Sequence, residues 1–237
     1  MLEGVHLIDV YRRRIGAPET VVVLDEVLAR SDVAELVAYV PPSRMLVVSR
    51  TLFAELATLP ADVAMLAVVP TPMPANTSPG RFCLLLEDVQ DPGNVGTMIR
   101  TAAAAGADQV VLSPHCAFAW SPRSLRAGQG AHFLTAVNEG VDLREWVAAF
   151  RHAGGRTFAT VVAGTAPLYR VDLRGRVAIV IGSEGSGVTR ALLDVVDERI
   201  TIPMAAGSES LNAAAAAAVV LFEAVRQRGQ GCSHYVR

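Results

Sequence analysis

The stretch VAIVIGSEGSGV, residues Val177–Val188, decides the fold, because a strand without polar residues runs directly into a glycine-rich turn. The five apolar residues Val177–Ile181 are typical of a parallel strand that is buried on both faces. Three glycines within the next six residues allow the backbone to approach a ligand closely. Their spacing is G-x-x-G-x-G, with Glu184 inside it. Because an acid repels pyrophosphate, this turn argues against a dinucleotide site.

The residues on both sides of this stretch alternate between strand and helix patterns. Strands are predicted at Phe82–Glu87, Gln109–Leu112, Thr157–Val162, Val177–Ile181 and Arg199–Ile202. Helices are predicted at Asn94–Ala105, Leu143–His152, Val188–Val195 and Leu211–Arg226. This alternation predicts an α/β domain with a mostly parallel sheet that helices cover on both faces. Ligands of such sheets bind beyond the carboxyl ends of the strands, where the unusual loops of this chain fall.

A proline-rich segment divides the chain. Residues 69–81 read VPTPMPANTSPGR, with four prolines and little to bury, so we expect a linker at 71–80 between domains at 1–70 and 81–237. In the first domain, strands are predicted at Thr20–Leu24, Arg44–Val48 and Met65–Val69, and helices at Leu2–Arg14, Ser31–Tyr39 and Ser49–Thr58. These elements predict a small α/β domain.

Composition excludes several classes of protein. With 51% hydrophobic and 19% charged residues over 237 positions, the chain can build a core and is not disordered. It contains no lysine, which excludes a Walker A loop and a pyridoxal phosphate Schiff base. The five histidines show no metal-ligand spacing, so no metal is expected.

The cellular setting is predicted from cysteines and from the longest apolar run. The three cysteines are widely spaced and form no CxxC pair, which favours a reduced, cytoplasmic protein. The longest unbroken apolar run, Ala213–Phe222, is ten residues, about half of a bilayer crossing, so no membrane association is expected. Glu3 stands where a signal peptide carries positive charge, which predicts no export.

Three loops that follow strands carry the residues suited to catalysis or to ligand binding. In Glu87–Arg100, a turn at Asp91–Gly93 precedes Asn94, which can cap the next helix, although an ordinary strand–turn–helix junction with an exposed arginine is equally open. The glycine-rich turn is the second loop. The third, Ile202–Asn212, leads into six consecutive alanines, and Ser210 can be read simply as a helix cap. The alanines also give a thin helix face that suits a dimer interface.

Together these loops resemble the SpoU (TrmH) family of RNA ribose methyltransferases, in the SPOUT superfamily. The first family pattern, N-x-G-x-x-x-R, matches Asn94, Gly96 and Arg100. The second, G-x-E-G-x-G, matches Gly182–Gly187. The third, I-P-M followed by S-L-N-x-x-x-A, matches Ile202–Met204 and Ser210–Ala216. A further segment, R-A-S-x-G-A in the family, is similar to Arg126–Ala131, with Gly128 in place of the small hydroxyl residue. The match covers about residues 81–228. Residues 1–70 resemble, less distinctly, the small RNA-binding domain that often precedes this domain.

The resemblance implies a C-terminal trefoil knot that binds S-adenosylmethionine, a homodimer formed through the C-terminal domain, and methylation of a ribose 2′-hydroxyl without a metal. On the matched positions, the cofactor is expected to contact Gly182, Ile202 and Leu211, with Ser183, Met204 and Ser210 as second choices. Apolar side chains in this set can pack on adenine, and backbone groups can hydrogen-bond it. Ribosomal RNA is favoured as the substrate because a separate N-terminal domain is present.

The same resemblance makes Arg100 the catalytic arginine. Because a guanidinium stays protonated at neutral pH, we favour a clamp on the adjacent phosphate that stabilises the developing alkoxide over a general base. Asn94, Glu184 and Asn212 are expected to hold Arg100 and the ribose. Contacts with RNA are expected from Arg126, which can act across the dimer, and from Arg123, Arg12 and Arg13. Arg12 and Arg13 can equally be interpreted as the solvated end of a helix.

Charge leaves alternatives open. Residues 1–80 hold 6 arginines and 9 acids, and residues 81–237 hold 15 arginines and 14 acids, so neither half is basic enough for strong non-specific RNA binding. The alternatives are a tRNA 2′-O-methyltransferase, a module that binds RNA or cofactor without turnover, and a nucleotide-dependent oxidoreductase built on the glycine-rich turn.

Overall fold

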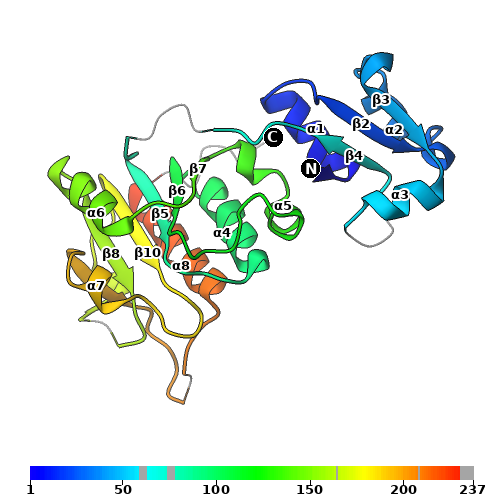
Figure 1. Ribbon diagram of the computed structural model, residues 1–237. Coiled ribbons are helices and arrows are strands. Elements are labelled where there is room, and N and C mark those ends of the chain that lie inside the picture. Colours follow the sequence, from blue (N-terminus) through cyan, green and yellow to red (C-terminus); the bar gives the residue numbers. More distant parts are fainter. Residues whose placement is uncertain (59–62, 74–77, 164, 208, 230–237) are drawn as a thin grey trace.

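The computed structural model describes residues 1–58, 63–73, 78–163, 165–207 and 209–229, which form two β-sheets in succession (Figure 1). The first sheet has the strand order β1-β4-β2-β3, with β2 parallel to β3 and β4 antiparallel to both of its neighbours. Its strands are β1 (Leu2–Glu3), β2 (Thr20–Leu24), β3 (Met45–Val48) and β4 (Met65–Val68). Its helices are α1 (Val5–Arg14), α2 (Ser31–Val37) and α3 (Arg50–Leu56).

The second sheet has seven strands in the order β7-β6-β5-β10-β8-β11-β9, and every pairing is parallel. The strands are β5 (Phe82–Leu86), β6 (Gln109–Leu112), β7 (Ala136–Asn138), β8 (Arg156–Thr160), β9 (Ala166–Pro167), β10 (Val177–Ile181) and β11 (Glu198–Thr201). The helices are α4 (Pro92–Ala104), α5 (Pro122–Gly128), α6 (Leu143–His152), α7 (Arg190–Leu193) and α8 (Ala213–Arg228). The predicted mostly parallel α/β sheet is confirmed.

Helices cover both faces of the seven-stranded sheet (Figure 1). On one face, α4 and α8 pack against alternate strand residues such as Leu84 and Ile179. On the other face, α6 and α7 pack against the intervening residues, such as Leu85 and Val180. Because strand side chains alternate between faces, each central strand needs apolar residues at every position. This requirement explains the unbroken apolar runs in the sequence. Within the described ranges, no helix is both long and apolar enough to span a bilayer.

Several predicted element boundaries were wrong for local reasons. The helix predicted at Leu2–Arg14 begins at Val5, because Leu2 and Glu3 pair with β4 and Gly4 turns the chain with φ 103°. Asn94 does not cap α4. Asp91 does, and it accepts a hydrogen bond from the Asn94 backbone N–H at 2.8 Å. The helix predicted at 188–195 is the single turn α7. Helix α5 and strand β9 were not predicted.

Helix α5 packs very closely on α4 and also contacts the first sheet. A Cβ on Gly96 of α4 would lie 2.1 Å from the backbone oxygen of Ser124 on α5, so only glycine permits this approach. A Cβ on Gly128 would lie 2.4 Å from the ring of His132. This contact explains why the segment Arg126–Ala131 has glycine at the position where the R-A-S-x-G-A pattern has a small hydroxyl residue. In Figure 1, α5 lies between α4 and the N-terminal elements.

Aromatic side chains join the two parts of the chain. Tyr11 of α1 meets Phe133 edge to face, with ring centroids 5.3 Å apart. Phe133 and His132 belong to a 3₁₀ turn, Ala131–Phe133, and both lie against Trp120. Leu7, Ile8 and Tyr11 of the first sheet's helix therefore share one buried cluster with residues of the second sheet. Edge-to-face pairs of this kind add about 0.5–1.5 kcal/mol beyond the burial of their area.

The ionisation of His132 makes folding pH-dependent. His132 is 3% exposed, its Nε2–H donates to the Ala119 carbonyl at 2.8 Å, and burial lowers its pKa from 6.5 to about 4. Between these two pKa values the unfolded chain binds a proton that the folded chain does not. The folded state therefore has its full stability above pH 6.5 and loses stability as the pH falls from 6.5 through 4. We expect this residue to account for about 2–3 kcal/mol of the stability lost between pH 7 and 4.5.

This effect can be measured by urea unfolding at both pH values. His132→Gln retains an amide donor for Ala119 but does not titrate, and we expect it to reduce the pH dependence by that amount. His152→Gln, at an exposed position, serves as the control and is expected to leave it unchanged. Equal pH dependence in wild type and His132→Gln would contradict the assignment.

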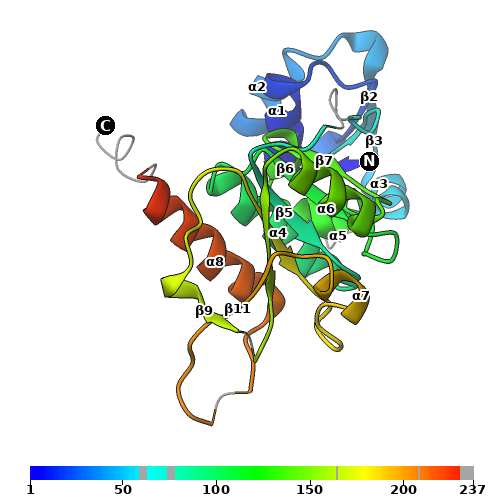
Figure 2. The ribbon, with the colours of Figure 1, turned by 90° about the vertical axis from the view of Figure 1, so that its left-hand side faces the viewer.

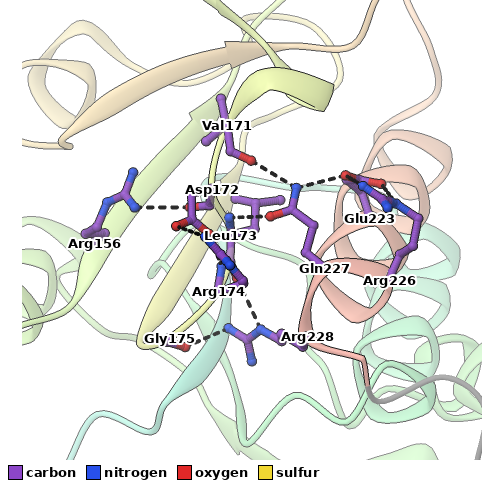
Figure 3. A network of polar contacts seen from close by, with 10 residues as sticks. All are labelled: Arg156, Val171, Asp172, Leu173, Arg174, Gly175, Glu223, Arg226, Gln227 and Arg228. Atoms are coloured by element: carbon purple, nitrogen blue, oxygen red, sulfur yellow. Dashed lines mark hydrogen bonds and ion pairs between the residues drawn. The ribbon is translucent and has the colours of Figure 1, made fainter.

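The C-terminal end of α8 is held by a polar network (Figure 3). Gln227 donates from Nε2 to the Val171 carbonyl at 2.9 Å and accepts from the Leu173 N–H at 2.8 Å. Arg228 donates to the carbonyls of Leu173 and Gly175 at 3.2 and 3.0 Å. These bonds satisfy the backbone of the segment that leads into β10, and they fix the end of α8 at the edge of the sheet where β10 begins.

Candidate functional site

A cavity of about 470 Å³ lies at the carboxyl ends of β8, β10 and β11. The last residues of these strands, or residues that directly follow them, line it: Thr160, Ile181 and Thr201 all contribute. The rest of the wall comes from the glycine-rich loop 182–188, the loop that follows β11, and the start of α8. The β11–α8 loop extends away from the sheet (Figure 2). The position is the one that parallel sheets use for ligands.

All six residues predicted to contact a cofactor line this cavity, namely Gly182, Ser183, Ile202, Met204, Ser210 and Leu211. Glu184 lines it as well. Sequence reasoning did not identify the contribution of Thr160, Val161 and Val162 from the β8 loop, nor that of Glu209. The contribution of the β8 loop could have been predicted from the sequence, because this loop follows a predicted parallel strand and therefore lies at the same carboxyl edge of the sheet as the glycine-rich loop.

The glycine-rich loop forms a tight cradle. A Cβ on Gly182 would lie 2.2–2.4 Å from the backbone of Gly187 and Val188, so the two ends of the loop touch. The Gly187 N–H donates to the Ser183 carbonyl at 2.9 Å and closes the loop. Gly187 has φ 67°, a conformation that favours glycine. A loop of this form exposes backbone groups to a ligand without intervening side chains.

The charge of the cavity is negative. Its lining includes the carboxylates of Glu184 and Glu209, and no arginine or histidine belongs to the described residues that line it. Carboxylates attract a cation and repel a phosphate chain. The cavity therefore suits a ligand that carries positive charge and a flat apolar group able to lie against Ile202 and Leu211. In the described part of the chain, no group of three or more His, Cys, Asp or Glu residues is arranged to hold a metal ion.

Three of the four predicted catalytic residues meet beside this cavity. Asn94 donates from Nδ2 to Glu184 Oε1 at 2.7 Å, and Asn212 donates from Nδ2 to Asn94 Oδ1 at 3.2 Å. Asn212 also caps α8, and its Oδ1 accepts from the N–H groups of Ala214 and Ala215 at 2.9 and 3.2 Å. The starts of α4 and α8 and the tip of the glycine-rich loop therefore converge through one chain of amide and carboxylate groups.

Arg100 lies apart from this chain on α4, six residues after Asn94, which places it about 9 Å further along the helix axis. Its side chain is exposed and makes no hydrogen bond or ion pair with any described residue. It does not line the cavity. An exposed guanidinium without a partner is ready to bind an anion from outside the protein.

The four arginines predicted to contact RNA fall into two pairs. Arg12 and Arg13 of α1 both bind the Asp9 carboxylate, at 2.9 and 2.8 Å, and Arg12 also lies over the Tyr39 ring at 4.1 Å. Arg123 and Arg126 of α5 are exposed and make no side-chain bond with the residues that the structure describes. The second pair is therefore the more available for an outside partner.

Comparison with known proteins places this site in a family. Residues 81–222 match the model of the SpoU rRNA Methylase family. The chain is 32% identical over 222 residues to the 23S rRNA (guanosine(2553)-2′-O)-methyltransferase RlmP of Bacillus subtilis, covering 94% of this chain and 86% of that protein. It is 36% identical over 153 residues to the 23S rRNA (uridine(2479)-2′-O)-methyltransferase of Streptomyces viridochromogenes, covering 62% of this chain and 53% of the relative, so the match spans about half of that protein.

Solved structures agree with the sequence matches. The SpoU methyltransferase AviRb from Streptomyces viridochromogenes, crystallised in complex with AdoMet, superposes with a TM-score of 0.84 at 29% identity, covering 97% of this chain and 90% of that one. A second crystal structure, of an RNA 2′-O ribose methyltransferase, gives 0.79 at 26% identity, covering 95% and 87%. The ordered motifs, the glycine cradle at the carboxyl edge of the parallel sheet and these matches together show that the chain belongs to the SpoU rRNA methylase family.

Proposed function

We propose that the protein transfers a methyl group from S-adenosylmethionine to a ribose 2′-hydroxyl of ribosomal RNA. The observation that carries the proposal is the acid-lined glycine cradle beside the Glu184–Asn94–Asn212 chain. A sulfonium cofactor has the positive charge and the adenine that this cavity suits, and it lacks the phosphate chain that the carboxylates repel. The curated relatives are named as 23S rRNA 2′-O-methyltransferases, which supports ribosomal RNA as the substrate.

The cradle residues fit the cofactor. The loop backbone from Gly182 onward offers hydrogen-bonding groups, while Ile202 and Leu211 offer apolar contact for the adenine. Ser183, Met204 and Ser210 complete the predicted contacts. When bound, the cofactor supplies an activated methyl group with a good leaving group, so the transfer needs no metal. The task of the protein is to orient the acceptor oxygen in line with the methyl carbon.

Residues beside the cavity orient and activate the acceptor hydroxyl. The 2′-hydroxyl would pass its proton to the neighbouring phosphate as its oxygen takes up the methyl group, for which the bound cofactor would supply a neutral thioether as leaving group. Arg100 binds the neighbouring phosphate and stabilises the negative charge that develops on the oxygen. Asn94, Glu184 and Asn212 hold the ribose at the entrance through their linked amide and carboxylate groups. Arg123 and Arg126, and less directly Arg12 and Arg13, contact the RNA backbone.

Titration calorimetry with S-adenosylmethionine, followed by transfer of radiolabelled methyl groups to RNA, tests the proposal. We expect saturable cofactor binding, and methyl incorporation into ribosomal RNA that is lost when the RNA is already 2′-O-methylated at the target. Incorporation into tRNA alone would favour the tRNA alternative, and binding without incorporation would favour a non-catalytic module. A folded sample that binds no cofactor would overturn the proposal, and quenching of NADH fluorescence would favour an oxidoreductase.

The wider organisation belongs to the same proposal. We assign residues 1–70 to an RNA-binding domain, 71–80 to the linker and 81–237 to the methyltransferase domain with its trefoil knot. The knot is proposed from the resemblance of the motifs to the family, and in the structure α8 packs on α4 and β10 after the β11–α8 loop. The homodimer, formed through the C-terminal domain, and the cytoplasmic setting stay predictions. Sedimentation velocity would test the dimer.

A further inference from the structure

A buried carboxylate lies at the base of the glycine-rich loop without lining the cavity. Glu87 directly follows β5 and is 8% exposed. Its Oε2 accepts from the Thr189 N–H at 2.8 Å, and its Oε1 accepts from Thr189 Oγ1–H at 2.7 Å. The two residues are 102 positions apart. Both carboxylate oxygens are thus used on a single residue, which immediately follows the loop 182–188.

The backbone of Glu87 holds the other end of the same loop. Its N–H donates to the carbonyl of Ile181 at 2.9 Å, and Ile181 is the last residue before Gly182. Glu87 therefore binds the residue that enters the loop through its main chain and the residue that leaves it through its side chain. Between these anchor points the two ends of the loop touch, with no room for a Cβ at Gly182.

The segment that begins at Glu87 also reaches the tip of the loop. Seven residues later, Asn94 donates to Glu184 at 2.7 Å. The glycine-rich loop is thus bonded to the β5–α4 segment at its base and at its tip. Carboxylate hydrogen bonds of this kind are charge-assisted and strong, and a buried N–H left without its acceptor is costly. The conformation of the loop depends on these bonds, because the loop itself has few side chains to pack.

We infer that Glu87 is a positioning residue which, through Thr189, fixes the glycine-rich loop in the form that binds S-adenosylmethionine. The inference rests on the proposed function. Glu87 does not line the cavity, so it acts on the cofactor only through the loop. Loosening the Glu87–Thr189 contact should therefore weaken cofactor binding more than an equal loss of stability elsewhere would.

The chain contains a matched control at the opposite edge of the same sheet. Asp197 Oδ2 accepts from both the N–H and Oγ1–H of Thr157, at 2.8 and 2.7 Å. Thr157 Oγ1 accepts in turn from the Asp197 N–H at 3.0 Å, just as Thr189 Oγ1 accepts from the Leu192 N–H at 3.3 Å. Thr157 lies near the start of β8 and Asp197 just before β11, away from the cavity at their carboxyl ends. Removing either threonine hydroxyl deletes the same two bonds.

The test compares Thr189→Val with Thr157→Val, which have the same shape change and the same lost bonds. Affinity for S-adenosylmethionine is measured by calorimetry and stability by urea unfolding. We expect Thr189→Val to raise the Kd at least tenfold and Thr157→Val to change it less than twofold, although both lose stability. Thr189→Ser keeps the hydroxyl and is expected to restore the Kd to within threefold of wild type. In methyl transfer, Thr189→Val should raise the cofactor KM with a smaller change in kcat.

Glu87→Ala provides a second route to the same result, with the same expected rise in Kd, and Thr189→Val serves alone where Glu87→Ala does not fold. Equal Kd values for Thr189→Val and Thr157→Val would overturn the inference while leaving the proposed function intact. A folded wild type that binds no S-adenosylmethionine would instead overturn the proposed function, and this inference with it.

Discussion

Arg100→Ala is expected to lower kcat for methyl transfer by about 100- to 1000-fold while leaving the Kd for S-adenosylmethionine unchanged. Removal of one donor from a developing oxyanion has an effect of this size in other enzymes. Arg100 does not line the cavity, so cofactor affinity should not respond. It is exposed and has no partner among the described residues, so the free energy of unfolding should change by less than about 0.5 kcal/mol.

Two further variants make this prediction specific. Arg100→Lys keeps a positive charge but loses the planar fork, so we expect it to recover only part of the activity. Arg123→Ala removes another exposed arginine, on α5, whose side chain bonds to none of the described residues, and it should raise the KM for RNA several-fold with kcat nearly unchanged. Single-turnover rates with saturating RNA and cofactor separate these effects. A kcat for Arg100→Ala within threefold of wild type would place the catalytic group elsewhere.

The central strands of this fold were predictable because a strand that is buried on both faces needs an apolar side chain at nearly every position. Thr20–Leu24, Gln109–Leu112 and Val177–Ile181 were predicted with the bounds that the structure shows. Each is a short apolar run between turn residues, and a strand buried on both faces admits little else. Leu143–His152 was also predicted with its observed bounds, because Asp142 caps it and Gly154 and Gly155 follow it.

The parts that could not be predicted depend on contacts between distant residues. Helix α5 is seven residues long, and its close approach to α4, with Gly96 against the Ser124 backbone, appears only when the two helices pack together. The motifs indicated Asn94 and Glu184, but their hydrogen bond joins residues 90 positions apart. The role of Glu87 could not be predicted from the sequence, because an acidic residue after a strand is common and its partner, Thr189, is known only from the folded structure.

Gly182→Ala is expected to raise the Kd for S-adenosylmethionine by at least 100-fold, which corresponds to about 2.7 kcal/mol. The added Cβ would lie 2.2–2.4 Å from the backbone carbon and oxygen of Gly187 and the nitrogen of Val188. Backbone atoms cannot rotate out of the way as a side chain can, so the two ends of the loop must separate. The free energy of unfolding should fall by about 1–3 kcal/mol, as in other overpacked sites.

A second glycine of the same loop separates this clash from a general need for glycine. A Cβ on Gly185 meets no atom within 4 Å, and Gly185 does not have the positive φ that Gly187 has. Gly185→Ala should therefore keep its stability and bind the cofactor within about fivefold of wild type. Calorimetry on both variants, with circular dichroism to check that each is folded, decides the matter. If both variants lost binding equally while stability stayed intact, the loop would be excluding side chains by contact with the ligand, and the closed base of the cradle at Gly182 would not be the cause.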